Sequence, residues 1–142
     1  MLYEAYWDMT VYEMLEKMNR RFGEKELFFY REGKETVEIS YARFFSDCQR
    51  LAGYLESKEL QGRRVVIDAR NTYEQVVSFF AVMSMGAIAC PLNFDLPEEE
   101  IAFALNRLEP GLLIYDAEDE TLMNWPEQER SPASAAPARM SR

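Results

Sequence analysis

The chain of 142 residues is 48% apolar, a composition typical of a single globular domain with a substantial core. Its net charge of -9 disfavours binding to nucleic acid or to an anionic membrane surface. The sequence has no histidine, which excludes the commonest general base and metal ligand, and its two cysteines are too few for structural zinc or a disulfide framework.

Residues 10–22 are predicted to form the first helix. Thr10 followed by Glu13 is a capping-box pattern, and apolar residues recur at helical spacing until Arg21 to Gly23. Residues 26–40 then contain two short β-prone runs on either side of Gly33. Because glycine readily adopts the positive φ of a tight turn, this segment is predicted to be a β-hairpin.

An amphipathic helix of about four turns is predicted from Tyr41 onward. Its apolar face is formed by Phe44, Cys48, Leu51 and Leu55. The β-branched run at residues 64–68 is typical of a covered central strand. Asn71, with Glu74 three residues later, is predicted to cap a helix over residues 72–85, and Gly86 to end that helix in the left-handed conformation.

Residues 87–90 are predicted to form a second strand that stops at Pro91, because proline has no amide hydrogen. Asp95 is predicted to cap the next helix, which has proline and three glutamates in its first turn. Pro110 and Gly111 break this helix before a last strand at residues 112–115.

The order from residue 41 is αβαβαβ, which predicts parallel strands joined by right-handed crossovers. The predicted fold class is therefore α/β: a partial, mostly parallel three-layer sheet, with an N-terminal helix and an antiparallel hairpin at the edge. After residue 116 the composition changes, first to an acidic run and then to a tail without acids or aromatic residues. Residues 1–116 are predicted to form a partial domain, and residues 117–142 an acidic linker and disordered tail.

Short motifs along residues 10–116 resemble, in order and spacing, the N-terminal opening of adenylate-forming (AMP-binding) enzymes. That superfamily includes acyl-CoA synthetases, the adenylation domains of peptide synthetases, and luciferases. The motifs are T-V-Y-E-M-L, R-F-G-E-K, I-S-Y-A-R-F, R-L-A-G-Y-L, Q-G-R-R-V-V-I, R-N-T-Y-E, A-V-M-S-M-G-A-I-A-C-P-L-N, L-P-E-E-E-I and L-E-P-G-L-L-I.

The resemblance implies a family that uses ATP, Mg and often CoA to activate a carboxylic acid as an acyl-adenylate. Such enzymes hold the nucleotide on a Ser/Thr/Gly-rich loop ending in Pro-Lys, on a later acidic motif and on a mobile C-terminal domain with a lysine. This sequence contains none of these motifs, and its six glycines stand singly. No catalytic, cofactor-binding or metal residue is therefore predicted, no cofactor is expected for this chain alone, and its status as an enzyme stays open.

Polar residues follow each predicted parallel strand, at the edge where ligands bind in such sheets. They are Asp68, Arg70, Asn71, Asn93, Asp95 and Asp116. The alternative interpretation, which we favour, is that these residues are helix caps and solvated loops. The apolar helix at 72–85 could likewise line an acyl pocket, but a core helix explains it better. Cys90 could be a nucleophile, yet no base is available to activate it.

Two functional hypotheses follow. The first is an N-terminal fragment of an ATP-dependent carboxylate-activating ligase that is inactive alone. The alternative is an interaction module, or one half of a split enzyme, whose partner would be a second copy or a separately encoded remainder. The N-terminus lacks the features of a signal peptide, and the longest apolar run, residues 76–83, is too short to cross a bilayer. A cytoplasmic protein without a nucleic-acid or membrane partner is expected.

Overall fold

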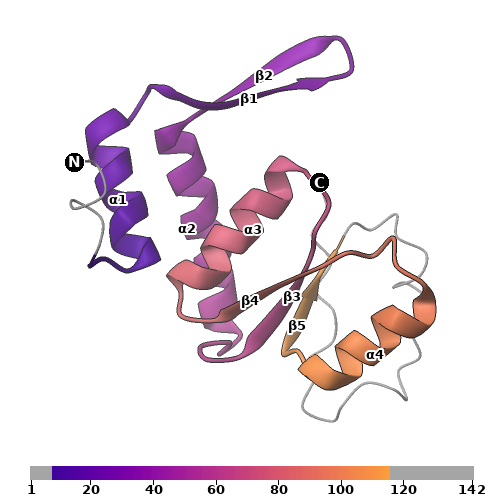
Figure 1. Cartoon of the computed structure of the whole chain (residues 1–142). Helices are drawn as coiled ribbons and strands as arrows, with labels where there is room; N and C mark the ends of the chain where they lie inside the picture. The colour runs from indigo at the N-terminus through magenta and orange to yellow at the C-terminus, as the bar shows by residue number, and fades with distance from the viewer. Residues whose placement is uncertain (1–7, 116–142) are drawn as a thin grey trace.

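The computed structural model describes residues 8–115 and confirms the predicted α/β class (Figure 1). In chain order the elements are α1 (Val11–Phe22), β1 (Glu26–Glu32), β2 (Glu35–Ser40), α2 (Tyr41–Ser57), β3 (Arg64–Asp68), α3 (Tyr73–Ser84), β4 (Ile88–Leu92), α4 (Glu98–Leu108) and β5 (Leu112–Ile114). The expected tail at residues 117–142 lies outside the described residues, so the division at residue 116 stays a prediction.

Helix α1 and the hairpin form as their local signals predict. The Thr10 hydroxyl accepts a hydrogen bond from the Glu13 amide at 3.2 Å, and the Glu13 carboxylate accepts one from the Thr10 amide at 2.9 Å. This reciprocal pair is the predicted capping box. Gly33 adopts a φ of +62° in the turn between β1 and β2.

The hairpin differs from the prediction in its location. Strands β1 and β2 form a two-stranded sheet of their own and do not extend the parallel sheet. The reason is that Ser40, the last residue of β2, is also the N-cap of α2, so the hairpin stays at the start of that helix. Its apolar side packs there, with the rings of Phe28 and Phe44 edge to face at 5.4 Å. Figure 1 shows the hairpin extending away from the parallel strands.

The second sheet has the strand order β4-β3-β5, and both strand pairs are parallel, as predicted. Side chains alternate between the two faces of β3. Val65 and Ile67 belong to the larger core, which includes buried residues of α2 and α3. Val66 packs in a second core with Ile101 and Leu105 of α4. Helices therefore cover both faces of the sheet, which confirms the three-layer arrangement (Figure 1).

The prediction that this strand ends at residue 90, before Pro91, is wrong by two residues. Strand β4 continues to Leu92, and Pro91 pairs in register with Ile67. Since β4 is an edge strand in the described sheet, its outward-facing amides need no partner there, and a proline at such a position removes no ladder hydrogen bond.

Helix α3 spans Tyr73–Ser84, close to the predicted 72–85, and Gly86 after it has the expected positive φ of +84°. Its buried residues include Val77, Ala81 and Val82, and its neighbours Val76, Phe79 and Phe80 pack against the same core. The interpretation of α3 as a core helix is thus preferred to an acyl pocket. None of the helices between residues 8 and 115 combines the length and apolarity that a bilayer crossing requires.

Candidate functional site

The carboxyl ends of β3 and β4 lie side by side, which brings together two of the predicted groups of polar residues. Asp68 is in register with Leu92, and the amide of Ala69 donates to the Leu92 carbonyl at 2.9 Å. The loop residues after β3 and those after β4 therefore share one edge of the sheet. Asp116, expected at the same edge, lies outside the described residues.

Asp68 and Arg70 form an ion pair within the loop after β3. The Asp68 carboxylate accepts hydrogen bonds from the Arg70 amide at 3.1 Å and from its Nε at 2.7 Å, and Nη2 lies 2.6 Å away. Asp68 is only 7% exposed. A carboxylate held by a backbone amide and a guanidinium fixes the conformation of this loop ahead of α3. Both side chains therefore have a structural role here.

The predicted cap at Asn71 is wrong. Thr72 is the N-cap of α3, and its hydroxyl accepts from the Gln75 amide at 3.1 Å. Because the helix begins at Tyr73, Glu74 is the second helical residue, so it stands one position too early for a capping box. Asn71 is instead exposed in the loop.

The predicted cap at Asp95 is also wrong. The Asn93 side chain accepts a hydrogen bond from the Asp95 amide at 2.9 Å, which makes a local turn after β4. Helix α4 begins after Pro97 without a side-chain cap. Three glutamates, Glu98 to Glu100, occupy its first turn, where negative charge is favourable beside the unpaired amides.

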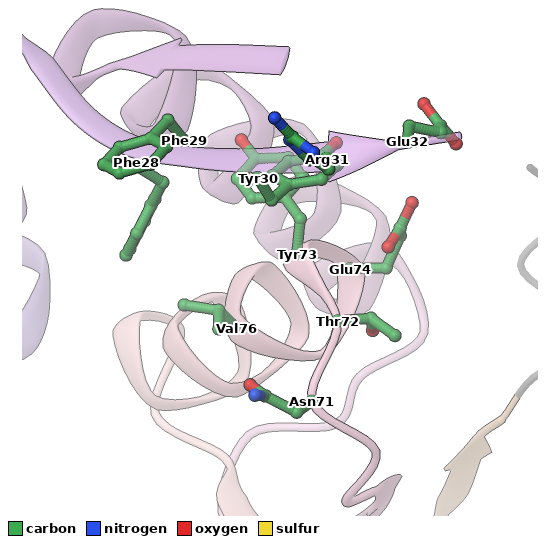
Figure 2. A pocket seen from close by; sticks show the side chains of 10 residues that line it. All are labelled: Phe28, Phe29, Tyr30, Arg31, Glu32, Asn71, Thr72, Tyr73, Glu74 and Val76. Carbon is green, nitrogen blue, oxygen red and sulfur yellow. The ribbon is translucent and has the colours of Figure 1, made fainter. Parts of the chain in front are cut away.

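A cleft of about 500 Å³ lies between β1 and the start of α3. Figure 2 shows Tyr30 of β1 facing Tyr73 of α3, with Glu74, Thr72 and Asn71 following on the α3 side. The residues that line it are Phe28, Phe29, Tyr30, Arg31, Glu32, Asn71, Thr72, Tyr73, Glu74 and Val76. No sequence motif predicts this cleft, because its two walls are about 40 residues apart in the chain.

Stacked tyrosines form the inner wall of the cleft. The rings of Tyr30 and Tyr73 lie 6.2 Å apart with an interplanar angle of 20°. The Tyr73 hydroxyl donates to Asp47 of α2 at 2.8 Å, and Asp47 also pairs with Arg50 and, at 3.8 Å, with Arg43. This network joins the start of α3 to α2.

Both phenols remain protonated at neutral pH. Burial, followed by the hydrogen bond and charge of Asp47, raises the pKa of Tyr73 well above its usual range. Burial also raises the pKa of Tyr30, with smaller contributions from Glu74 and Glu32. A neutral phenol with a raised pKa is a poor general base, so the cleft wall provides packing and hydrogen bonds and no acid–base pair.

The two cysteines are not activated. Burial raises the pKa of the Cys48 thiol to about 12, with a smaller contribution from Asp47. Burial also raises the pKa of Cys90, which is half-buried in β4. The thiolate is the reactive form, so neither residue is poised as a nucleophile. Between residues 8 and 115, no group of three or more Cys, Asp or Glu side chains is arranged to hold a metal ion.

A family model and the most similar curated sequences agree on one family of enzymes. The model of the AMP-binding enzyme family matches residues 15–139, which extends beyond residue 116, where the resemblance was expected to end. A long-chain-fatty-acid–CoA ligase of Thermus thermophilus is 30% identical over 110 residues, which cover 77% of this chain and 20% of that protein. The 4-hydroxybutyrate–CoA ligase 2 of Metallosphaera sedula is 26% identical over 111 residues, covering 78% of this chain and 20% of that protein.

The fold is also found in solved structures. The anthranilate CoA ligase AuaEII in complex with anthranoyl-AMP superimposes with a TM-score of 0.80 at 20% identity, over 93% of this chain and 25% of that chain. This similarity supports the same fold for the described residues. The chain spans about a fifth of the length of the two CoA ligases above.

Proposed function

Because the chain belongs to the AMP-binding enzyme family, we propose that it forms the N-terminal part of an ATP-dependent ligase that activates a carboxylic acid, and that it is inactive alone. The Thermus and Metallosphaera relatives are named as CoA ligases, and each is about five times longer than the matched segment. Their acids differ, a long-chain fatty acid in one and 4-hydroxybutyrate in the other, so the proposal names the reaction type and no single acid.

One observation carries the proposal: the side chains of Asp68, Arg70 and Asn93 at the ligand edge already have structural partners within the chain. Asp68 and Arg70 bind each other, and the Asn93 side chain binds the Asp95 amide. Phosphate loops need several consecutive backbone amides that converge on the anion, usually from closely spaced glycines. The glycines with positive φ here, at positions 23, 33, 62 and 86, are scattered singly along the chain. These features support the proposal that the triphosphate binds to residues outside this chain.

Calorimetric titration of ATP with Mg into the purified chain tests the proposal, together with acid-dependent ATP–pyrophosphate exchange. The acids are a long-chain fatty acid, anthranilate and 4-hydroxybutyrate, and the Thermus ligase at the same concentration is the positive control. We expect no saturable ATP binding and no exchange above the protein-free blank. Saturable binding of ATP by the 142-residue chain alone would refute the proposal.

A second candidate is an interaction module, which the exposed aromatic side chains favour. Phe29 on β1 is 71% exposed and Phe103 on α4 is 68% exposed. Large exposed apolar groups mark interaction surfaces when they gather into patches. Light scattering over a hundredfold range of protein concentration tests self-association. A constant monomer mass would argue against the self-associating form of this candidate.

A further inference from the structure

The cleft between β1 and the start of α3 has the size and the mixed lining of a small-molecule site. Its volume of about 500 Å³ lies within the range of roughly 300–1,000 Å³ that is usual for such sites. Such sites combine apolar and aromatic walls with a few polar groups that fix the orientation of the ligand. The proposed function gives this cleft no role, so its lining has to be considered separately.

The aromatic wall of the cleft is held in place before any ligand binds. Tyr30 and Tyr73 stack on each other, and the Phe28 ring lies edge-on to Tyr73 at 6.3 Å. The hydrogen bond from the Tyr73 hydroxyl to Asp47 fixes that ring from the α2 side. Both tyrosines are half-buried, so part of each ring stays accessible at the cleft (Figure 2). Aromatic rings attract planar apolar groups and also cations.

Two acidic side chains line the same cleft, one from each wall. Glu32 is the last residue of β1, and Glu74 lies in the first turn of α3. Figure 2 shows Glu74 extending from α3 toward β1, at the end of the cleft where Glu32 lies. Within residues 8–115, neither carboxylate forms an ion pair with a lysine or arginine. A cation in the cleft would therefore displace no existing partner of these two side chains.

The negative charge of these carboxylates reaches the aromatic wall. Burial is the largest cause of the raised pKa of Tyr30, and Glu74 and Glu32 raise it further, whereas Arg43 lowers it by a smaller amount. Arg31 also lines the cleft, but successive side chains of a strand point to opposite faces, which separates it from Tyr30. Figure 2 shows the Arg31 guanidinium on the side of β1 away from α3. Negative charge therefore dominates beside the tyrosines.

We propose that this cleft binds a small organic cation with a planar apolar body, such as an aryl amidinium or an aryl amine. The body packs against Tyr30 and Tyr73, and the charged group lies between Glu32 and Glu74. Each exposed ion pair changes the affinity by about two- to fivefold, and a cation beside an aromatic ring has a similar effect. Binding is thus weak but selective for positive charge. This site and the proposed function do not depend on each other.

An NMR titration of the whole chain at pH 7 with three probes of similar shape tests the site. Benzamidinium is the cation, benzamide its neutral counterpart, and benzoate the anion. Benzamidinium is expected to shift the amide signals of Tyr30, Tyr73 and Glu74 in a saturable way, and to leave the signal of Phe103 on α4 unchanged. Benzamide should bind at least about fivefold more weakly, because it forms no ion pair with the two carboxylates. Benzoate should not bind in the cleft.

Three results of this titration would overturn the proposal. The first is the absence of saturable shifts in the cleft up to a benzamidinium concentration of about 50 mM, which covers even an inefficient ligand of this size. The second is equal or tighter binding of benzamide or benzoate, which would show that positive charge is not recognised. The third is saturable shifts confined to residues outside the cleft, which would place the binding site elsewhere.

Charge-matched variants separate the two carboxylates of the cleft from the net charge of the chain. Glu32→Gln and Glu74→Gln should each weaken benzamidinium binding by about two- to fivefold. Glu56→Gln changes the net charge by the same amount at an exposed position of α2 outside the cleft, so it should leave the affinity unchanged. If all three variants weaken binding equally, the general negative charge of the surface attracts the probe and the proposal is wrong.

A second pair of variants tests the aromatic wall. Tyr30→Phe keeps the ring and should bind benzamidinium as the unmutated chain does, whereas Tyr30→Leu removes the ring and should weaken binding by about two- to fivefold. If Tyr30→Leu folds, judged by circular dichroism, and binds with unchanged affinity, the ring is not part of the site and the proposal is wrong. If Tyr30→Leu does not fold, the three probes and the glutamine variants decide, because they leave the aromatic wall intact.

Discussion

Removing the Tyr73 hydroxyl should destabilise the chain measurably, because this group links α3 to α2 through Asp47. A hydrogen bond to a charged group contributes about 1.5–3 kcal/mol. Asp47 keeps its contacts with Arg43 and Arg50 in the Tyr73→Phe variant, and the Tyr30 stack is unchanged, so the expected loss is about 1–2 kcal/mol. With a urea dependence of about 2 kcal/mol per molar, the unfolding midpoint should fall by roughly 0.7 M.

The hydrogen bond from Tyr73 to Asp47 also predicts that the free energy of unfolding depends on pH. The pKa of Tyr73 is raised in the folded state, so folding favours the protonated phenol. This contribution is complete below the ordinary tyrosine pKa of about 10 and is lost as the pH rises toward the higher pKa of the folded state. The stability difference between the original chain and Tyr73→Phe should therefore shrink above pH 10.

Urea unfolding followed by circular dichroism at pH 8 and at pH 10.5 measures both effects. A double-mutant cycle with Asp47→Ala should give a coupling energy close to the loss in Tyr73→Phe. Tyr30→Phe is the control, because it removes the hydroxyl of the stacked neighbour and leaves the Asp47 bond intact. A midpoint for Tyr73→Phe equal to that of the unmutated chain, or a coupling energy near zero, would refute the assigned role of this bond.

Three further changes test local features of the fold. Because Thr72 caps α3, Thr72→Ala should lower the free energy of unfolding, measured in thermal melts, by about 1 kcal/mol, and Asn71→Ala should have little effect. Equal effects of the two substitutions would contradict the assignment of Thr72 as the cap. Gly86→Ala should lower the free energy of unfolding by about 1 kcal/mol or more, because Gly86 has a φ of +84°. Gly53→Ala should raise it by about 0.5–1 kcal/mol, because Gly53 lies inside α2 with open space around it. A change of the same sign in both variants would contradict the conformational role given to Gly86. Cys48, whose pKa is about 12, should resist a thiol-specific aromatic disulfide at pH 8 in the folded chain and react at once in urea; rapid reaction while folded would show that the thiol is accessible.

Features that depend on a few neighbouring residues were predictable from the sequence. The Thr10 capping box, the Gly33 turn and the Gly86 helix end each need only local backbone geometry, and the structure confirms all three. The parallel strand pairing was also predictable, because the alternation of helices and strands leaves few topologies.

The choice between adjacent caps was not predictable, since Asn71 and Thr72 both carry side-chain acceptors. Tertiary contacts accompany the observed choice. When Thr72 is the cap, Tyr73 becomes the first helical residue and reaches both Tyr30 and Asp47. Those partners lie on β1 and α2, and no local pattern around residue 72 reports where they are.

The cleft was not predictable from the sequence for a related reason. Its walls depend on where the hairpin lies, and the sequence pattern predicts the hairpin at the edge of the parallel sheet. The observed position follows from Ser40, which ends β2 and caps α2 without an intervening loop. This junction places Tyr30 beside Tyr73 at the start of α3. The wrong position of the hairpin therefore left the cleft unpredicted.

Pro91 lies inside β4 because of the side of the strand that its nitrogen faces. Its presence inside β4 is compatible with the sheet only if its nitrogen faces away from β3, and the Ile88 and Leu92 backbone bonds require that orientation. The Arg63 carbonyl and the Ala69 amide of the β3 segment bond to β4, so alternation turns Val65 and Ile67 toward β4 as well. Their register partners in β5, Leu112 and Ile114, therefore face β3, and Leu113 faces outward. Proline is thus tolerated in β4 because β4 is an edge strand in the described sheet, whereas a proline in β3, which pairs on both sides, would remove a hydrogen bond.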